Sequence, residues 1–104
     1  MTFEDLLAEA AAELAGVTTV TDSSGATTWS RGAVVFAAVS VDGSVASFRL
    51  DPAIAAAAVG TPDTMPSSRG TGWVDFAPDT IDDHAEDRAV AWLESAHRRL
   101  GPRD

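Results

Sequence analysis

The stretch from Ala33 to Val41 constrains the fold of this chain more than any other feature. It is a nearly continuous apolar run, AVVFAAVSV, whose β-branched and aromatic residues favour a strand. Such a run is typical of a central strand that is covered on both faces over part of its length. Asp42-Gly43 follows directly and predicts a two-residue type I′ turn, in which both central residues adopt positive φ. A central strand that leads into a hairpin is therefore expected here.

Further strands are expected on both sides of this run. Val17–Thr21 and Ala26–Ser30 are short segments rich in β-branched and short polar residues, and the turn sequence Asp22–Gly25 joins them, so they predict a hairpin. After the Asp42-Gly43 turn, the segment Ser44–Leu50 alternates in hydrophobicity and predicts another strand. The face of that strand that carries Ala46, Phe48 and Leu50 should point into the core.

Two long amphipathic helices are expected at either side of the strand region. Thr2–Leu14 places its apolar residues on one stripe at helical spacing, and Thr2 with Asp5 resembles a capping box. Thr80–Leu100 shows the same periodicity, and Gly101-Pro102 is a typical stop signal.

The segment between the last two predicted strands contains a shorter helix. Asp51 is a suitable cap, and Pro52 suits the first position of a helix that runs to Val59. Thr61–Thr71 is rich in proline, glycine, serine and threonine, so we expect an exposed loop. Gly72–Phe76 then predicts the last strand.

These elements together predict an α+β fold. We expect a single antiparallel β-sheet of about five strands, a meander, packed by an N-terminal and a C-terminal helix, with the short helix between the last two strands. The 104 residues suffice for one core, so residues 1–104 are predicted to be a single α+β domain. An apolar content of 45% places the chain outside the class of disordered proteins.

The charge balance restricts the partners and the compartment. With 16 acidic and 7 basic residues the net charge is -9, which repels nucleic acid and anionic lipid on average. Glu4 and Asp5 stand where a secretory signal carries positive charge, and no apolar run approaches the ~18 residues that span a bilayer. The chain has no cysteine, as is common in reducing compartments. We therefore expect a cytoplasmic protein, and its alanine-rich, lysine-free composition is typical of GC-rich bacterial genomes.

Several short motifs occur in an order that is found in one known family. They are the amino-terminal helix, Arg31–Val39 followed by Asp42-Gly43, Leu50-Asp51-Pro52, Gly72-Trp73-Val74, and Asp82-Asp83 ahead of a helix with Trp92. In this order they resemble the TfoX amino-terminal domain family (TfoX/Sxy) over nearly the whole chain. Thr28–Gly32 stands where that family has Met-Phe-Gly-Gly. The resemblance implies a compact α+β domain and a link to the regulation of competence genes, known from members with a second, carboxy-terminal domain.

The MmcQ/YjbR family is the second choice. Its arrangement of elements is similar, and its members tend to carry a lysine or arginine in the Gly-Trp-Val region, where this sequence offers Arg69. That resemblance implies a nucleic-acid-associated protein.

Arg69, Gly70 and Trp73 form the cluster with the clearest functional interpretation. An arginine on a loop beside a tryptophan can hold a carboxylate or phosphate, or stack on a base. In the alternative interpretation Trp73 closes the edge of the core and Arg69 is solvated. Arg31 is a further candidate, because Arg31, Arg49 and Arg69 would form a local basic patch if the fold brought them together.

The other reactive side chains do not form a catalytic pattern. His84 and His97 lie thirteen positions apart on one helix, too far to share a metal ion without a partner chain. The hydroxyls of Ser67 and Ser68 have no base near them in sequence. Carboxylates crowd the start of the last helix, where they complement its dipole: Asp82, Asp83, Glu86 and Asp87. We therefore expect no catalytic residue, no metal site and no cofactor.

Three functional hypotheses follow. The first is a non-enzymatic domain, a regulatory or protein-interaction module, whose partner is a second copy of the chain or an unidentified protein held through a sheet edge or a helix face. The second is a nucleic-acid-associated protein that uses Arg31, Arg49 and Arg69. The third is a small-ligand-binding or hydrolytic pocket near Trp73.

Overall fold

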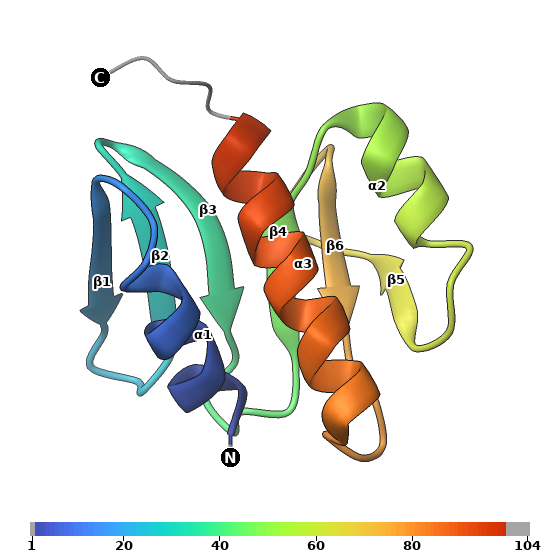
Figure 1. Ribbon diagram of the computed structural model, residues 1–104, viewed down its shortest axis with the longest axis horizontal. Helices are drawn as coiled ribbons and strands as arrows, with labels where there is room; N and C mark the ends of the chain where they lie inside the picture. Colours follow the sequence, from blue (N-terminus) through green and yellow to red (C-terminus); the bar gives the residue numbers. More distant parts are fainter. Residues whose placement is uncertain (1, 100–104) are drawn as a thin grey trace.

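The computed structural model describes residues 2–99, which form one six-stranded antiparallel sheet and three helices (Figure 1). The elements are, in chain order, α1 (Phe3–Ala11), β1 (Val17–Thr21), β2 (Thr27–Arg31), β3 (Val34–Val39), β4 (Ala46–Arg49), α2 (Pro52–Ala58), β5 (Thr64–Pro66), β6 (Trp73–Phe76) and α3 (Asp83–Arg99). The predicted α+β fold is thus confirmed. The predicted helix end at Leu100 and the stop at Gly101-Pro102 lie outside the described residues.

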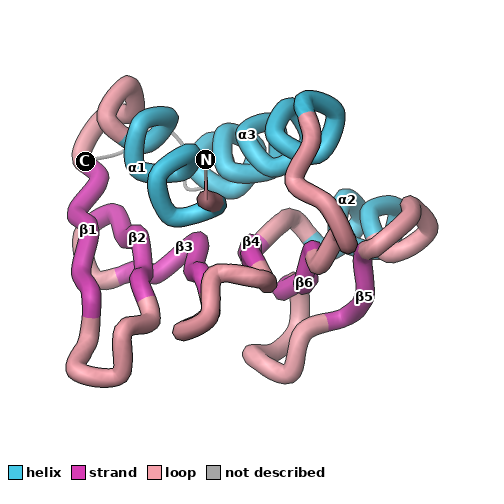
Figure 2. Tube along the Cα trace, turned by 90° about the horizontal axis from the view of Figure 1, so that it is seen from below, coloured by secondary structure: helices cyan, strands magenta, loops and turns pink. Residues whose placement is uncertain are grey.

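The three helices lie on one side of the sheet (Figure 2). Helices α1 and α3 pack against each other, and α3 also contacts β3 and β4. Helix α2 lies at the other end of the layer, next to β5 and β6. Within residues 2–99, no helix or strand covers the opposite face of the sheet. The molecule therefore has a helical face and an open sheet face.

The strand order is β1-β2-β3-β4-β6-β5, with every neighbouring pair antiparallel. Strands β1 to β4 form the predicted meander. The prediction of a loop over Thr61–Thr71 was wrong for Thr64–Pro66, which pair with β6 as the edge strand β5. A strand of three residues that includes a proline cannot be recognised from its own sequence, because it forms only by pairing with the neighbouring strand. The sheet therefore has six strands, and β6 lies between β4 and β5.

The turn at Asp42-Gly43 is present but is not the predicted two-residue type. Gly43 has a φ of 77°, whereas Asp42 is not among the described residues with positive φ. The loop closes instead where Ser40 N–H donates to Val45 O at 2.9 Å. The Asp42 carboxylate accepts from Ser44 N–H at 3.0 Å and from the Ser40 hydroxyl at 2.8 Å, which favours the wider loop. Strand β4 consequently begins at Ala46 rather than at Ser44.

Side-chain caps determine where the helices begin. Asp5 N–H donates to Thr2 Oγ1 at 3.1 Å, as the capping pattern predicted. Ala53 N–H donates to Asp51 Oδ1 at 3.0 Å, which confirms Asp51 as the cap of α2. Ala85 N–H donates to Asp82 Oδ1 at 2.8 Å, so α3 starts at Asp83 and not at the predicted Thr80. These bonds satisfy amide groups that the first turn of a helix leaves without a backbone partner.

The core lies between the helices and the sheet. Its largest fully buried side chains are Trp29, Phe3, Phe36, Phe48, Phe76, Leu7, Leu50 and Leu93. Ala37 and Ala38 are adjacent in β3, so they point to opposite faces of the sheet, and both are fully buried. Only Ala37 belongs to the core under the helices, so Ala38 is buried although no described helix or strand lies over its face. The ring of Trp92 on α3 meets that of Phe76 at right angles, with centroids 5.0 Å apart, and joins the helix to β6.

Candidate functional site

A small apolar hollow lies between α2 and the segment that leads into β6. Its volume is about 220 Å³, and its lining includes Ala55, Ala56, Val59, Pro66, Gly72 and Trp73. Trp73 is half-buried, and Val74, which also lines the hollow, is buried. The site is therefore built from small or aliphatic side chains and one indole.

The local sequence explains why this space stays open. The side chains that α2 presents to it are the methyl groups of Ala55 and Ala56, which leave room that larger residues would fill. Gly70 and Gly72 adopt φ values of 138° and 84°, which are unfavourable for residues with a Cβ atom. The loop can therefore turn sharply next to α2.

Arg69 lies on the ring of Trp73. The guanidinium carbon is 5.4 Å from the ring centroid, within the range of a cation–π interaction. The Arg69 side chain is otherwise exposed, and its backbone N–H donates to Ser67 Oγ at 3.2 Å. The structure thus brings together the arginine and the tryptophan that the sequence singled out.

A second arginine neighbours the same tryptophan. Arg49 on β4 is the cross-strand partner of Trp73 in the antiparallel register. Residues that lie directly opposite each other share one face of a sheet, with Cβ atoms about 5 Å apart. Trp73 is therefore flanked by two guanidinium-bearing residues.

Arg31 lies in another part of the sheet. It pairs with Val17 and Val34, and strands β3 and β4 separate its strand from β6. A Cβ atom at Gly16 would lie 3.8 Å from Arg31 Nε, so this side chain runs beside the connection between α1 and β1. The structure does not place Arg31 with Arg49 and Arg69 in one patch.

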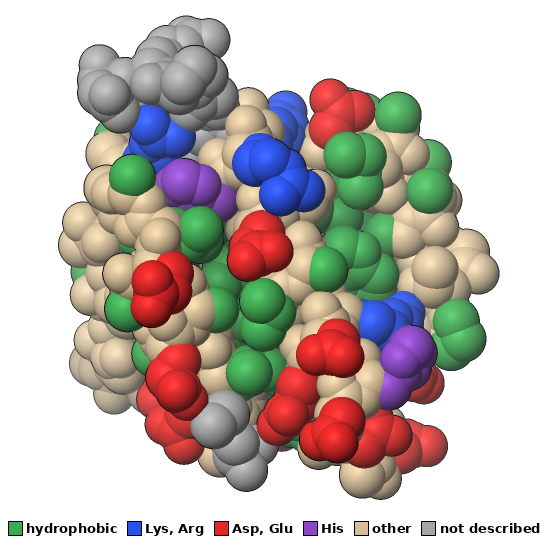
Figure 3. Space-filling view, viewed as in Figure 1, with side chains coloured by type: hydrophobic (Ala, Val, Ile, Leu, Met, Phe, Trp, Pro, Cys, Tyr) green, Lys and Arg blue, Asp and Glu red, His purple; other side chains and the backbone are tan. Residues whose placement is uncertain are grey.

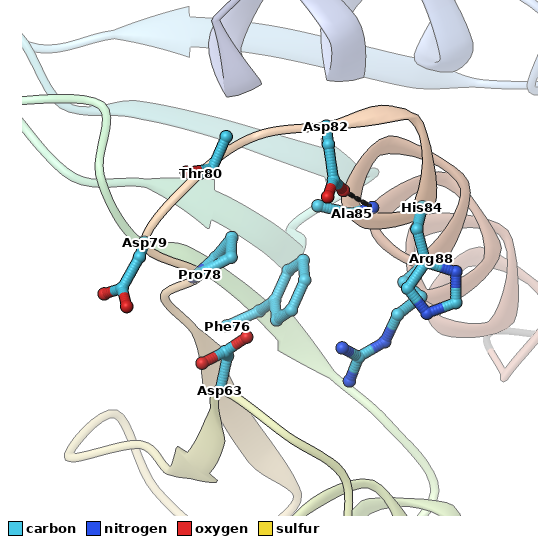
Figure 4. A pocket seen from close by; sticks show the side chains of 9 residues that line it. All are labelled: Asp63, Phe76, Pro78, Asp79, Thr80, Asp82, His84, Ala85 and Arg88. Carbon is cyan, nitrogen blue, oxygen red and sulfur yellow. Dashed lines mark hydrogen bonds between the residues drawn. The ribbon is translucent and has the colours of Figure 1, made fainter.

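A second hollow, also of about 220 Å³, lies at the start of α3 and is acidic (Figure 4). Asp79 lies across it from His84 and Arg88, and Asp63 lies at its lower side. Asp82 caps α3, so its carboxylate already has a structural role. Within residues 2–99, no group of three or more histidine, aspartate or glutamate side chains is placed to hold a metal ion.

Arg88 joins three parts of the fold at this second hollow. Its guanidinium carbon is 4.7 Å from the ring centroid of Phe76 and 4.9 Å from that of Trp92. Its Nη2 donates to Thr61 Oγ1 at 2.7 Å and to Pro62 O at 2.9 Å. The sequence carries one signal for this role, the four-residue spacing of Arg88 and Trp92 on one helix face.

Charge is unevenly distributed over the helical face. Figure 3 shows acidic side chains around the start of α3 and basic side chains near its end. At the basic end, Arg98 and Arg99 are exposed and line a shallow hollow with Ser95, Ile54 and Asp51. This separation follows the helix dipole, as expected from the sequence.

The two histidines lie in different surroundings. His97 Nε2 lies 2.9 Å from the carbonyl oxygen of Ala15, and its ring packs edge-on against Phe36. His84 is exposed beside the acidic hollow. In the described part of the chain, no hydrogen bond joins a histidine to a serine or threonine hydroxyl.

Comparisons with protein-family profiles, with curated proteins and with solved structures find no match to this chain. The resemblance to the TfoX amino-terminal family stays a prediction. No helix within residues 2–99 is both long enough and apolar enough to cross a bilayer.

Proposed function

We propose that this chain is a non-enzymatic recognition domain that binds an apolar residue with a neighbouring carboxylate on a protein partner. The site is the hollow beside Trp73. One observation carries the proposal: the guanidinium of Arg69 stands over the ring of Trp73, and Trp73 lines an apolar hollow.

The size and lining of the hollow support a side chain as the occupant. At about 220 Å³ it is smaller than the roughly 300–1,000 Å³ of common small-molecule and cofactor sites. Its aliphatic and aromatic lining favours an apolar group, because burial of apolar surface is favourable in proportion to its area. A single leucine or phenylalanine side chain meets both conditions.

The two arginines support a carboxylate next to that side chain. A guanidinium forms charge-assisted, often bidentate, hydrogen bonds with a carboxylate. Arg69 and Arg49 both neighbour Trp73, whereas the chain as a whole carries a charge of -9. The negative average field opposes a polyanion such as DNA far more than it opposes a single carboxylate. The carboxyl terminus of a protein, with an apolar last residue, combines the two features.

The arrangement of the reactive groups supports a role without catalysis. Catalysis by a hydroxyl nucleophile needs a base within hydrogen-bond reach, and His97 instead contacts the Ala15 carbonyl. Binding without chemistry is what a regulatory module requires. The resemblance to the TfoX amino-terminal family favours such a regulatory role as well.

A titration followed by amide chemical shifts tests the proposal. The probe is N-acetyl-Gly-Phe, and the matched control is the same peptide with a carboxyl-terminal amide. We expect the free acid to shift the amide signals of Gly70 and Gly72 and the indole signal of Trp73, with far smaller shifts for the amide. Equal shifts for both peptides, or shifts that map elsewhere, would contradict it.

A second titration separates this function from the nucleic-acid alternative. We expect a labelled DNA duplex to show no binding even at low salt, where phosphate contacts are strongest. Salt-dependent binding that Arg49 and Arg69 substitutions abolish would instead support the MmcQ/YjbR-like hypothesis.

A further inference from the structure

The two edges of the sheet differ in how they are protected. Strand β5 has only three residues, and Pro66 is one of them, which are common ways to prevent edge pairing. Strand β1 has five residues, VTTVT, without charge or proline, and four of the five are exposed. It is the outermost strand in both views of the backbone, and no other described element lies beyond it (Figures 1 and 2). Strand β1 is therefore an edge without the usual protection.

The backbone groups that face outward on β1 follow from the hairpin. Asp22 N–H donates to Ala26 O at 2.9 Å, so Asp22 directs its amide towards the β2 side. Hydrogen-bonding direction alternates along an antiparallel strand. The N–H and C=O groups of Val17, Thr19 and Thr21 consequently point to the free edge.

We propose that β1 pairs antiparallel with β1 of a second copy of this chain, about a two-fold axis at Thr19, so that the two sheets join edge to edge. This surface lies at the opposite edge of the sheet from the Trp73 hollow and goes beyond the function proposed above.

The strand is complementary to itself in that register. Thr19 faces Thr19 of the second copy, and Val17 faces Thr21 of the second copy, so outward amides meet outward carbonyls. Val20, which is 52% exposed, gains Thr18 of the second copy as its cross-strand neighbour. A shift by one residue would place outward groups opposite inward groups and lose these hydrogen bonds.

The same register brings opposite charges together. It places Asp22 of the second copy opposite Gly16, and the Arg31 side chain runs beside Gly16. Symmetry repeats this Asp22–Arg31 proximity at the other end of the paired strands. Hydrogen bonds from Ser24, Gly25 and Ala26 lower the pKa of Asp22, so its carboxylate is charged at neutral pH. The attraction between Asp22 of one copy and Arg31 of the other, at both ends of the uncharged strand, offsets part of the repulsion between two chains of charge -9.

Cysteine cross-linking tests the register directly, because the chain has no cysteine of its own. In the proposed dimer the two Thr19 Cα atoms lie about 5.5 Å apart, within the ~4.4–6.8 Å that a disulfide spans. The two Val20 Cα atoms lie about 8 Å apart, beyond that range. Under mild oxidation we expect Thr19→Cys to form a covalent dimer and Val20→Cys to stay largely monomeric. Equal cross-linking of both variants, or none in either, would overturn the proposal.

A backbone substitution tests the same surface without a disulfide. Thr19→Pro removes the outward N–H at the two-fold axis, and proline is tolerated on edge strands. Thr19→Val keeps that N–H and is the matched control.

By sedimentation equilibrium at increasing concentration, we expect the unmodified chain and Thr19→Val to approach twice the monomer mass. Thr19→Pro should stay at the monomer mass with an unchanged circular dichroism spectrum. A dimeric Thr19→Pro, or an unmodified chain that stays monomeric at millimolar concentration, would refute the proposal. Neither result changes the outcome of the peptide titration at Trp73, so the β1 dimer can be refuted without refuting the proposed function.

Discussion

Leu50 and Gly72 approach each other more closely than residues with side chains allow. Leu50 N–H donates to Gly72 O at 2.8 Å, and a Cβ atom at Gly72 would lie 2.9 Å from Leu50 O. Gly72 lines the apolar hollow and comes directly before Trp73. The position of the tryptophan at the candidate site therefore depends on a glycine at this contact.

Gly72→Ala should lower the free energy of unfolding by more than the positive φ of Gly72 alone explains. A left-handed φ costs a residue with a Cβ atom about 1–2 kcal/mol, and the clash with Leu50 O adds to that cost. Gly32→Ala is the matched control, because Gly32 has a φ of 63° but no atom within 4 Å of the added Cβ. Urea unfolding measures the free energy of unfolding of both variants. Equal losses in the two variants would show that the contact between Gly72 and Leu50 is unimportant.

Arg88→Met should lower the free energy of unfolding by about 1–3 kcal/mol, because it removes stacking on two rings and hydrogen bonds to the α2–β5 connection. Methionine keeps an apolar side chain against Phe76, so the decrease in the free energy of unfolding measures the contribution of the guanidinium group. Arg98→Met, at an exposed position on the same helix, should change stability by less than about 0.5 kcal/mol. Thermal or urea unfolding compares the two variants. Similar effects in both would contradict the role assigned to Arg88.

The sequence predicted the elements whose signal is local. Apolar periodicity located α1 and α3, and the alternation over Ser44–Leu50 correctly placed Phe48 in the core. Strand β5 was missed because its pairing depends on β6, which lies later in the chain. The loop at Asp42 was assigned the wrong turn type because side-chain hydrogen bonds, rather than the Asp-Gly pair alone, determine its length.

The sequence predicts which candidate residues lie together only where they are close in the chain. Arg69 and Trp73 are four residues apart in one segment, so a local argument was enough to place them together. Arg49 and Arg31 depend on strand order, which the sequence did not specify. Strand order brings Arg49 next to Trp73 and keeps Arg31 away. The contribution of α2 to the hollow likewise arises only from tertiary packing.

Stability should fall in acid as the loop at Asp42 loses its charge. Hydrogen bonds from Ser44 and Ser40 lower the pKa of Asp42 from 3.8 to about 2. A carboxyl whose folded pKa is lowered stabilises the fold above its unfolded pKa, and this contribution is lost as the pH falls through the folded pKa. The unmodified chain should therefore be more stable than Asp42→Asn at pH 6, and the difference should shrink between pH 4 and pH 2. A difference that does not change with pH would contradict this account.

The central claim, that the Trp73 hollow recognises an apolar residue with a carboxylate, is tested most directly by the Kd of N-acetyl-Gly-Phe in the unmodified chain and in Arg69→Met. We expect the substitution to weaken binding of the free acid about ten- to a hundredfold, since one charge-assisted hydrogen bond contributes roughly 1.5–3 kcal/mol. Binding of the amidated peptide should stay unchanged. An equal loss for both peptides, or no loss for either, would contradict the claim.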